Sequence, residues 1–345
     1  MTDSVTPDTP ASTPPPPPSR PHWSLRLLLW AFVMGLGAAY GVLGYQFFAT
    51  LFSDSARGRS GLMTVAFLAM LPLCIGALAV LLIQRQRRVG FWQAMGMSSV
   101  PLLLFMFLAG TVLREGFICI LMALPLVLVL GFVGAAIGWL ASALSKGNST
   151  RMMSVVVFVP FAFGAVEQEL PLQDQVQAVA RSIDIQAPPE VVWRHINMPT
   201  DIQPGELKDG VAYRIGVPYP IEGRTLEPRV GGKRHLVWQR GVAFDEEITV
   251  WEPERRVAWK YVFGPGSFPE GSLDDHIVIG GRYFNLEDTT YTLTPQAGGS
   301  TRLTVDVTFR VSTHFNWYAG TWARFLVSDT AETILGFYKH RAEAG

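Results

Sequence analysis

Residues 152–193 read MMSVVVFVPFAFGAVEQELPLQDQVQAVARSIDIQAPPEVVW, and this stretch divides the chain into two parts. Its first part, Met152–Val166, is almost entirely apolar. Glu167 and Asp174 follow, and residues 178–186 then alternate polar and apolar side chains. Such alternation is typical of a strand with one buried face. The stretch therefore predicts that a membrane-embedded half ends here and that a water-soluble α+β domain begins.

Charge is distributed unequally between these halves, although the 345 residues carry no net formal charge. Residues 1–166 hold 10 Lys and Arg against 4 Asp and Glu, whereas residues 167–345 hold 18 against 24. A basic membrane half is what cytoplasmic loops produce. An acidic soluble half disfavours nucleic acid as a partner and electrostatic docking on anionic lipid. Cys74 and Cys119 both lie in apolar runs, so neither a disulfide framework nor a thiolate metal site is expected.

The N-terminal segment, residues 1–21, is rich in Pro, Thr, Ser and Asp, with prolines at every position from 14 to 18. Because such a segment buries little apolar area, we predict a disordered tail with polyproline character. A ligand for a proline-recognising partner is the alternative. The first apolar run begins late and is too long for a signal-peptide core.

Long apolar runs predict a bundle of four or five membrane-spanning helices. The first four runs reach the roughly 20 residues needed to cross ~30 Å of hydrocarbon. The last run is about 22 Å long as a helix, and it crosses if Arg151 snorkels and Glu167 marks the other interface. The runs cover residues of about 25–52, 61–84, 91–113, 117–144 and 152–166.

Lys and Arg placement predicts that the N-terminus lies in the cytoplasm, because seven basic loop residues then lie inside and three outside. Five crossings, which we favour, place residues 167–345 outside the cytoplasm, and four keep them inside. We therefore expect an integral protein of a bacterial inner membrane, with its soluble domain on the non-cytoplasmic side.

Two glycine patterns, Gly37–Gly41 and Gly134–Gly138, have a small-residue spacing that lets helices approach closely. They offer surfaces for a helix-mediated oligomer. The middle of each predicted span carries no ionisable residue, and a transporter or proton relay usually needs one. We interpret the helices as an anchor and packing unit.

The second half predicts a curved antiparallel sheet of about seven strands, folded around one long C-terminal helix. A strand at 178–186 precedes a short helix that begins at Ala187–Glu190. The final helix, from about Asn316 to Ala342, has apolar residues at steps of three and four. The space between sheet and helix is the natural ligand site. Turn signals separate the other strands, at 225–230, 233–239, 242–251, 256–263, 282–294 and 301–311.

Residues Arg181–Trp193 resemble the opening strand and helix of the START-related helix-grip superfamily, also called SRPBCC, which includes polyketide cyclases and lipid-transfer domains. Gly241–Pro253 and Tyr291–Leu303 resemble its central and closing hairpins. The resemblance covers about half the chain and implies a helix-grip domain at 175–345 with a ligand pocket. Members share a pocket rather than a fixed set of catalytic residues, so the resemblance assigns no catalytic role.

Aromatic residues on the predicted strands and the long helix suit a flat or lipid-like guest, although many must pack the core. Asp329 lies one turn beyond Phe325. If it faces inward, it needs a partner such as Arg229 or Arg240, because an unpaired buried carboxylate is costly. The candidate pocket residues are Trp238, Phe244, Trp259, Tyr261, Phe284, Phe309, Trp322, Phe325 and Asp329.

Candidate chemistry is sparse in the soluble half. Asp274, Asp275 and His276 could coordinate a cation or relay a proton, but we interpret them as solvated loop charges. Glu246 and Glu247 are adjacent on a strand and therefore face opposite sides. The six histidines show no metal-ligand spacing, and no nucleophile elbow or phosphate loop is present in the sequence. We expect no catalytic residue, metal or cofactor.

These observations favour membrane-anchored binding of a hydrophobic small molecule or lipid, without catalysis. One alternative is a cyclase, dehydratase or hydrolase that uses Asp274 or Glu246 as a general acid–base group. Another is a membrane interaction or regulatory module whose helices assemble with partners. The expected partners are the hydrophobic ligand and the membrane.

Overall fold

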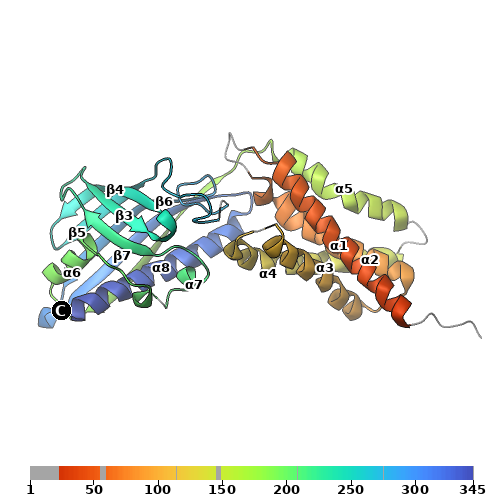
Figure 1. Cartoon of the computed structure of the whole chain (residues 1–345), viewed down its shortest axis with the longest axis horizontal. Coiled ribbons are helices and arrows are strands. Elements are labelled where there is room, and N and C mark those ends of the chain that lie inside the picture. The colour runs from red at the N-terminus through yellow and green to blue at the C-terminus, as the bar shows by residue number, and fades with distance from the viewer. Residues whose placement is uncertain are drawn as a thin grey trace, which may run out of the picture.

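The computed structural model describes residues 23–54, 60–113, 115–144, 149–207, 209–274 and 276–344. The proline-rich segment 1–21, predicted to be a disordered tail, lies outside these residues. In the described part, a helical bundle is joined end to end to a domain of one sheet and one long helix (Figure 1). The N-terminal end of the bundle lies farthest from the sheet domain.

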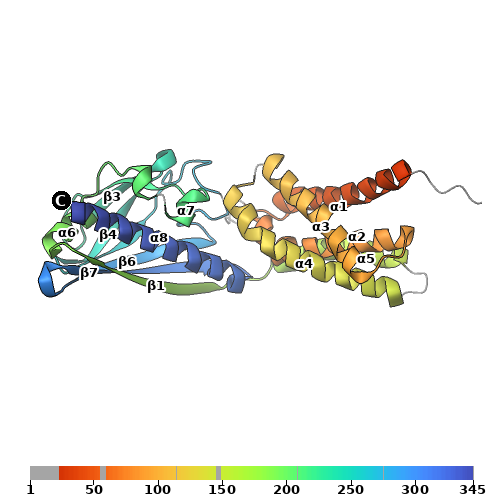
Figure 2. The same ribbon diagram turned by 90° about the horizontal axis from the view of Figure 1, so that it is seen from below.

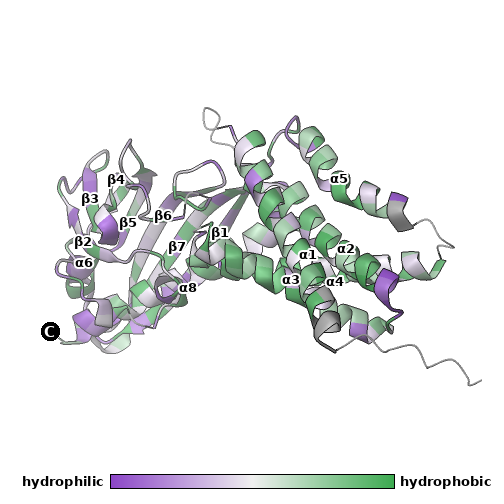
Figure 3. Ribbon diagram, turned by 45° about the vertical axis from the view of Figure 1, so that its right-hand side comes forward, coloured by the Kyte–Doolittle hydropathy of each residue, from purple (hydrophilic) through white to green (hydrophobic). Residues whose placement is uncertain are grey.

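The bundle contains four described helices that are long and apolar enough to cross a membrane, at Trp30–Leu51, Ala66–Gln86, Phe91–Thr111 and Phe117–Leu144. Hydrophobic residues predominate along these helices, whereas hydrophobic and hydrophilic residues are mixed in the sheet domain (Figure 3). The elements are α1 (Trp23–Leu51), the short helix η2 (Gly61–Met63), the turn of π-helix η3 (Ala66–Met70), α2 (Leu71–Gln86), α3 (Phe91–Thr111), α4 (Phe117–Leu144) and α5 (Ser149–Glu167).

The last helix of the bundle, α5, matches the shortest predicted span and is not among those four. It packs along α2 and runs back toward the sheet domain (Figure 1). Its last residue, Glu167, is buried, and its carboxylate accepts hydrogen bonds from the Val65 and Ala66 amides at 2.7 and 2.8 Å. A carboxylate at the start of a helix satisfies free amides and complements the helix dipole. The end of α5 and the start of the η3–α2 helix are therefore fixed together.

The two glycine patterns let helices of this same chain approach each other. A Cβ atom at position 41 on α1 would lie 2.6 Å from the Phe105 ring of α3. At Gly134 on α4, a Cβ atom would lie 1.8 Å from the Leu73 carbonyl oxygen of α2. These faces are covered within the chain, so a helix-mediated oligomer, which stays a prediction, would use other surfaces.

The sheet domain confirms the predicted START-like fold. Its seven strands form one antiparallel sheet in the order β1-β7-β6-β5-β4-β3-β2, so that the first strand pairs with the last. The strands are β1 (Asp174–Ile185), β2 (Pro220–Thr225), β3 (Lys233–Trp238), β4 (Ala243–Glu252), β5 (Arg256–Val262), β6 (Phe284–Pro295) and β7 (Thr301–Ser312). The helices are α6 (Pro189–Asn197), α7 (Val211–Arg214) and α8 (Asn316–Ala344), with short 3-10 turns at Pro204–Glu206, Gln239–Gly241 and Ala297–Gly299.

One strand was predicted in the wrong place. The strand expected at 225–230 is β2, which ends at Thr225, and the following residues form a turn. Pro228 has no N–H to donate to a ladder, which favours the upstream pairing. The turn is tight, because a Cβ atom at Gly232 would lie 2.1 Å from the Glu227 carbonyl oxygen.

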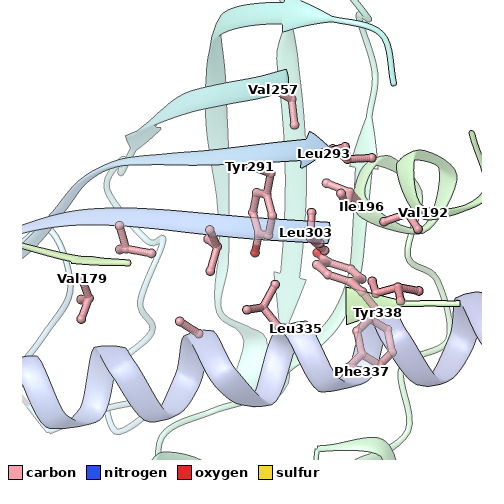
Figure 4. Close-up of a cluster of buried hydrophobic side chains, with 14 of the residues drawn as sticks. Val179, Val192, Ile196, Val257, Tyr291, Leu293, Leu303, Leu335, Phe337 and Tyr338 are labelled. Carbon is pink, nitrogen blue, oxygen red and sulfur yellow. The ribbon is translucent and has the colours of Figure 1, made fainter. Parts of the chain in front are cut away.

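The core of this domain lies between the sheet and α8, which crosses one face of the sheet (Figure 2). In β7 the predicted alternation is present, since Leu303 and Phe309 are buried and Arg302 is exposed. Tyr291 and Leu303 of the sheet point toward α8, where Tyr338 lies (Figure 4). Truncating such a fully buried leucine to alanine typically costs about 2–5 kcal/mol.

Hydrogen bonds hold the domain against the bundle. The Tyr318 hydroxyl at the start of α8 donates to the Met122 carbonyl in the first turns of α4. The Ser60 amide donates to the Tyr283 hydroxyl at 2.6 Å. The beginnings of α4 and α8 accordingly lie side by side (Figures 1 and 2).

Candidate ligand-binding cavity

A cavity of about 330 Å³ lies between the sheet and α8. One face of α8 forms part of its wall, with residues at steps of three and four that include Ala319, Ala323, Val327 and Ala331. The same cavity continues into the bundle, where residues of α3 and α4 line it. Its walls are mainly apolar, which suits a hydrophobic guest.

Four of the nine candidate pocket residues line this cavity. Trp238 of β3, Trp259 and Tyr261 of β5, and Phe284 of β6 all contribute to its wall. Their side chains come from three strands because inward-facing residues of a curved sheet converge on its concave side. Contact of these four residues with a ligand stays a prediction.

The other five candidates lie elsewhere. Phe244 and Phe309 are packed into the core, so they support the cavity wall without lining it. Trp322 and Phe325 contact each other edge to face on α8, away from the cavity lining, and Phe325 is 47% exposed. The helical period alone did not distinguish the inner from the outer face of α8, because aromatic residues lie on both.

Asp329, the ninth candidate, has a structural partner that the sequence did not suggest. Its Oδ2 accepts a hydrogen bond from the Ala212 amide at 2.8 Å, near the start of α7. The proposed partners are engaged elsewhere: Arg229 pairs with Glu227, and Arg240 Nη1 donates to the Ser272 carbonyl at 3.1 Å. Asp329 does not line the cavity, so the condition for an arginine partner is not met, and its carboxylate fastens α7 to α8.

A buried ion pair forms one polar part of the cavity wall, and Glu115 and His276 form another. Arg234 of β3 and Glu246 of β4 are directly opposite in the strand register, and their side chains meet at 2.5 Å between Nη1 and Oε2. They are 3% and 2% exposed, respectively. Arg234 also donates from Nη2 to the Ile196 carbonyl at 3.0 Å and lies 4.7 Å from the centre of the Trp259 ring. Glu247, the next residue, is exposed, as the strand alternation predicted.

The electrostatics of this pair follow from its burial. Burial raises the pKa of Glu246 to about 7, although the neighbouring Arg234 pulls it the other way. Burial likewise raises the pKa of the Tyr213 and Tyr261 hydroxyls, so both stay neutral. Among the described residues, Tyr213 Oη and Arg234 Nε are buried and have no hydrogen-bond partner. Both atoms belong to groups that can donate a hydrogen bond.

A second polar cluster lies where the domain meets the bundle. The Tyr45 hydroxyl of α1 donates to Glu115, and His276 Nε2 lies 3.6 Å from Glu115 Oε1. Asp274 Oδ1 accepts a hydrogen bond from the His276 amide at 3.0 Å. Burial favours the neutral form of Glu115, but hydrogen bonds from His276 and Tyr45 hold its pKa below the usual value.

The same cluster has the donor set of a divalent-cation site. One ligand atom from each of Glu115, Asp274 and His276 lies within 4.8 Å of the other two, and carboxylate and imidazole groups suit several transition metals. Asp275, the third member of the predicted loop group, lies outside the described residues. The interpretation of Asp274 and His276 as solvated charges is wrong, because both are half-buried at the junction.

Comparison with known proteins agrees with this geometry. The family described as polyketide cyclase/dehydrase and lipid transport matches residues 176–343. A helix-grip domain with an internal cavity is the class of protein that the structure defines. Residues 176–343 of this chain form a domain that belongs to that family. A search of curated proteins found no match.

Similar solved structures each cover about half of this chain. A START superfamily protein from Mycobacterium smegmatis is 13% identical, with 48% of this chain and 97% of the other covered, at a TM-score of 0.33. The Zhui aromatase/cyclase from a Streptomyces species is 16% identical, with 49% of this chain and 94% of the other covered, at a TM-score of 0.30. A protein from Mesorhizobium loti is 18% identical, with 47% of this chain and 96% of the other covered, at a TM-score of 0.27.

The candidate pocket residues chosen from the sequence did not include Arg234 or the lining residues of the bundle. Arg234 could have been found, because a hairpin turning near Gly241 places it opposite Glu246. The lining residues of the bundle, such as Phe105 and Ala123, could not. Every face of a membrane-spanning helix is apolar, so hydropathy does not separate a cavity-lining face from a lipid-facing one.

Proposed function

We propose that this protein is a membrane-anchored receptor that binds a hydrophobic small molecule or lipid in its helix-grip cavity, without catalysis. The observation that carries the proposal is the cavity of about 330 Å³ with mainly apolar walls, which the domain shares with an attached bundle that has four candidate membrane spans. Transfer of an apolar ligand from water into such a cavity is favourable. Attachment to the bilayer places the cavity where such ligands accumulate.

The test is to identify what the full-length protein carries after purification in detergent. Native mass spectrometry and lipid analysis should find a bound hydrophobic molecule. Ala331→Trp places a bulky side chain on the cavity-lining face of α8, and it should remove that molecule. The matched control is Ala344→Trp on the same helix, because position 344 is exposed and should leave occupancy unchanged.

Two results would contradict the proposal. A wild-type protein that carries no hydrophobic molecule, even after incubation with extracted membrane lipids, would contradict it directly. Equal occupancy in wild type and in a folded Ala331→Trp protein would place the ligand outside the cavity. Thermal melting curves of each variant establish whether it is folded.

An acid–base enzyme is the second candidate, favoured by Glu246. This carboxyl lines the cavity beside Arg234, and burial raises its pKa to about 7, which is near the value that suits a general acid or base at neutral pH. Asp274, the other proposed acid, is not among the lining residues. Glu246→Gln separates the two functions, because an enzyme would lose turnover while a receptor would still bind its ligand.

A further inference from the structure

The cavity does not end at the sheet domain, because one face of α4 also forms its wall. Val127 lies ten residues beyond Phe117, the start of α4, which corresponds to about 15 Å along the helix. If α4 crosses the bilayer, this part of the cavity lies within the hydrocarbon layer. The lining residues of α4 follow steps of three and four: Cys119, Ile120, Met122, Ala123, Leu126 and Val127.

Other helices of the bundle close the wall around this part. Phe105 and Ala109 contribute from α3, and Phe67 and Pro72 contribute from the η3–α2 helix. The opposite faces of α3 and α4 carry exposed apolar residues such as Phe107 and Val129, which suit contact with lipid. The bundle therefore has a lipid-facing surface and, inside it, an apolar extension of the domain's cavity.

Tyr45, Glu115 and His276 also line the cavity where the domain meets the bundle, but they contact one another. The part of the cavity within the sheet domain offers buried hydrogen-bond donors that have no partner among the described residues. Tyr213 Oη and Arg234 Nε line this region and have no acceptor among the described residues. Tyr338 is an electrostatic neighbour of both residues. Because Arg234 is already paired with Glu246, the region offers donors with little net charge. It suits a small head group with an acceptor oxygen, such as a hydroxyl or carbonyl, better than a phosphodiester.

We infer that the membrane half supplies one end of the ligand site, and that the ligand is a bilayer amphiphile with one long apolar chain. This inference rests on the proposed function and specifies its ligand. The chain lies among α2, α3 and α4, and the small polar end lies beside Arg234 and Tyr213. The contact of Tyr318 with the Met122 carbonyl keeps the two ends of the site aligned.

The experiment uses the full-length protein in phosphatidylcholine nanodiscs that contain a photoreactive long-chain alcohol, hexadecanol with a diazirine group. One version carries the diazirine near the hydroxyl and the other carries it near the chain end. After irradiation, mass spectrometry should place the chain-end label on α3 or α4 peptides and the hydroxyl-end label on peptides from α7, β3 or α8.

Two substitutions on α4 give a matched pair. Ala123→Trp fills the bundle part of the cavity and should lower labelling of the protein about tenfold, a change of about 1.4 kcal/mol in affinity. Ile137→Trp is the control, because position 137 is 52% exposed and lies away from the cavity. If Ala123→Trp does not fold, Ala109→Leu on α3 narrows the same space, and the label positions in wild type still test the inference.

The outcomes separate this inference from the proposed function. Loss of labelling in Ala331→Trp but full labelling in Ala123→Trp, with no label on α3 or α4, would overturn the inference and leave the proposed function intact. Unchanged labelling in both variants would overturn both. A chain-end label in the sheet domain together with a hydroxyl-end label in the bundle would reverse the orientation and overturn the inference.

Discussion

Arg234 and Glu246 form a contact that is costly to desolvate, because two charged groups are withdrawn from water at one point. Such a pair is weakly stabilising as a whole, yet removal of one partner typically costs about 3–5 kcal/mol. Gly223 makes room for the arginine, since a Cβ atom there would lie 2.8 Å from Arg234 Nη2. The inward placement of a polar pair in an apolar cavity is what a site for an amphiphile needs.

Titration of the Glu246 carboxyl gives a prediction about a single residue. Burial raises its pKa to about 7 from the usual 4.5, so the native state binds the proton more tightly than the unfolded state. The contribution of this proton binding to the free energy of unfolding is therefore fully present below pH 4.5, and it is lost as the pH rises through about 7. Because Glu246→Gln does not titrate, the melting temperature of wild type should fall relative to this variant across that window. Parallel melting curves of the two proteins at every pH would contradict the prediction.

At the scale of helices and strands, the predictions that succeeded were those for which the sequence shows one clear hydrophobic period. The alternation in β7 has one buried and one solvent-facing side, and the apolar period of α8 marks a helix of the correct length. β2 was misplaced because a short segment such as Pro220–Thr225 has little alternation, and its position depends on pairing with β3. Pairing is a tertiary effect that a local pattern does not contain.

The candidate site was only partly predictable for a related reason. Aromatic residues such as Trp259 and Phe309 face the same side of the sheet, but one lines the cavity and the other fills the core. The difference depends on which side chains of other elements cover each residue, and this is set by tertiary packing. Strand period alone gives the side of the sheet that a residue faces and does not give that distance.

Gly134 provides a prediction about helix packing. Replacement by leucine should prevent α4 from packing on α2, because even a Cβ atom would lie 1.8 Å from the Leu73 carbonyl oxygen. We expect a loss of more than about 4 kcal/mol, which amounts to loss of folded protein. Yield of monodisperse protein and its melting temperature in detergent measure the effect.

The matched control for Gly134 is Gly96→Leu on α3, where nothing lies within 4 Å of the added Cβ atom. It should fold normally. If Gly134→Leu instead folds as well as this control and only dissociates a larger assembly, the glycine face mediates oligomers, as one sequence hypothesis held.

At the scale of the whole molecule, the arrangement of the helices links the sequence to membrane orientation. The sheet domain adjoins the end of α5, whereas the described N-terminus lies at the opposite end of the bundle (Figure 1). Basic residues at the end of α2 and just beyond it, Arg85 and Arg87 among them, lie away from Glu167, which caps the start of that helix. Basic loops favour the cytoplasm. We therefore propose that the domain lies on the non-cytoplasmic side of a bacterial inner membrane.

Cysteine labelling in intact cells tests this orientation. Ala297→Cys places a thiol in the exposed turn between β6 and β7, and Arg87→Cys places one in the exposed loop after α2. With the proposed orientation, a membrane-impermeant maleimide should label position 297 once the outer membrane is permeabilised, and position 87 only after lysis. The wild-type chain measures background from Cys74 and Cys119, which lie within the bundle helices. Labelling of position 87 but not of position 297 in intact cells would place the domain in the cytoplasm. In that case α5 would still cross the membrane, but the basic residues after α2 would lie outside, against the usual charge rule.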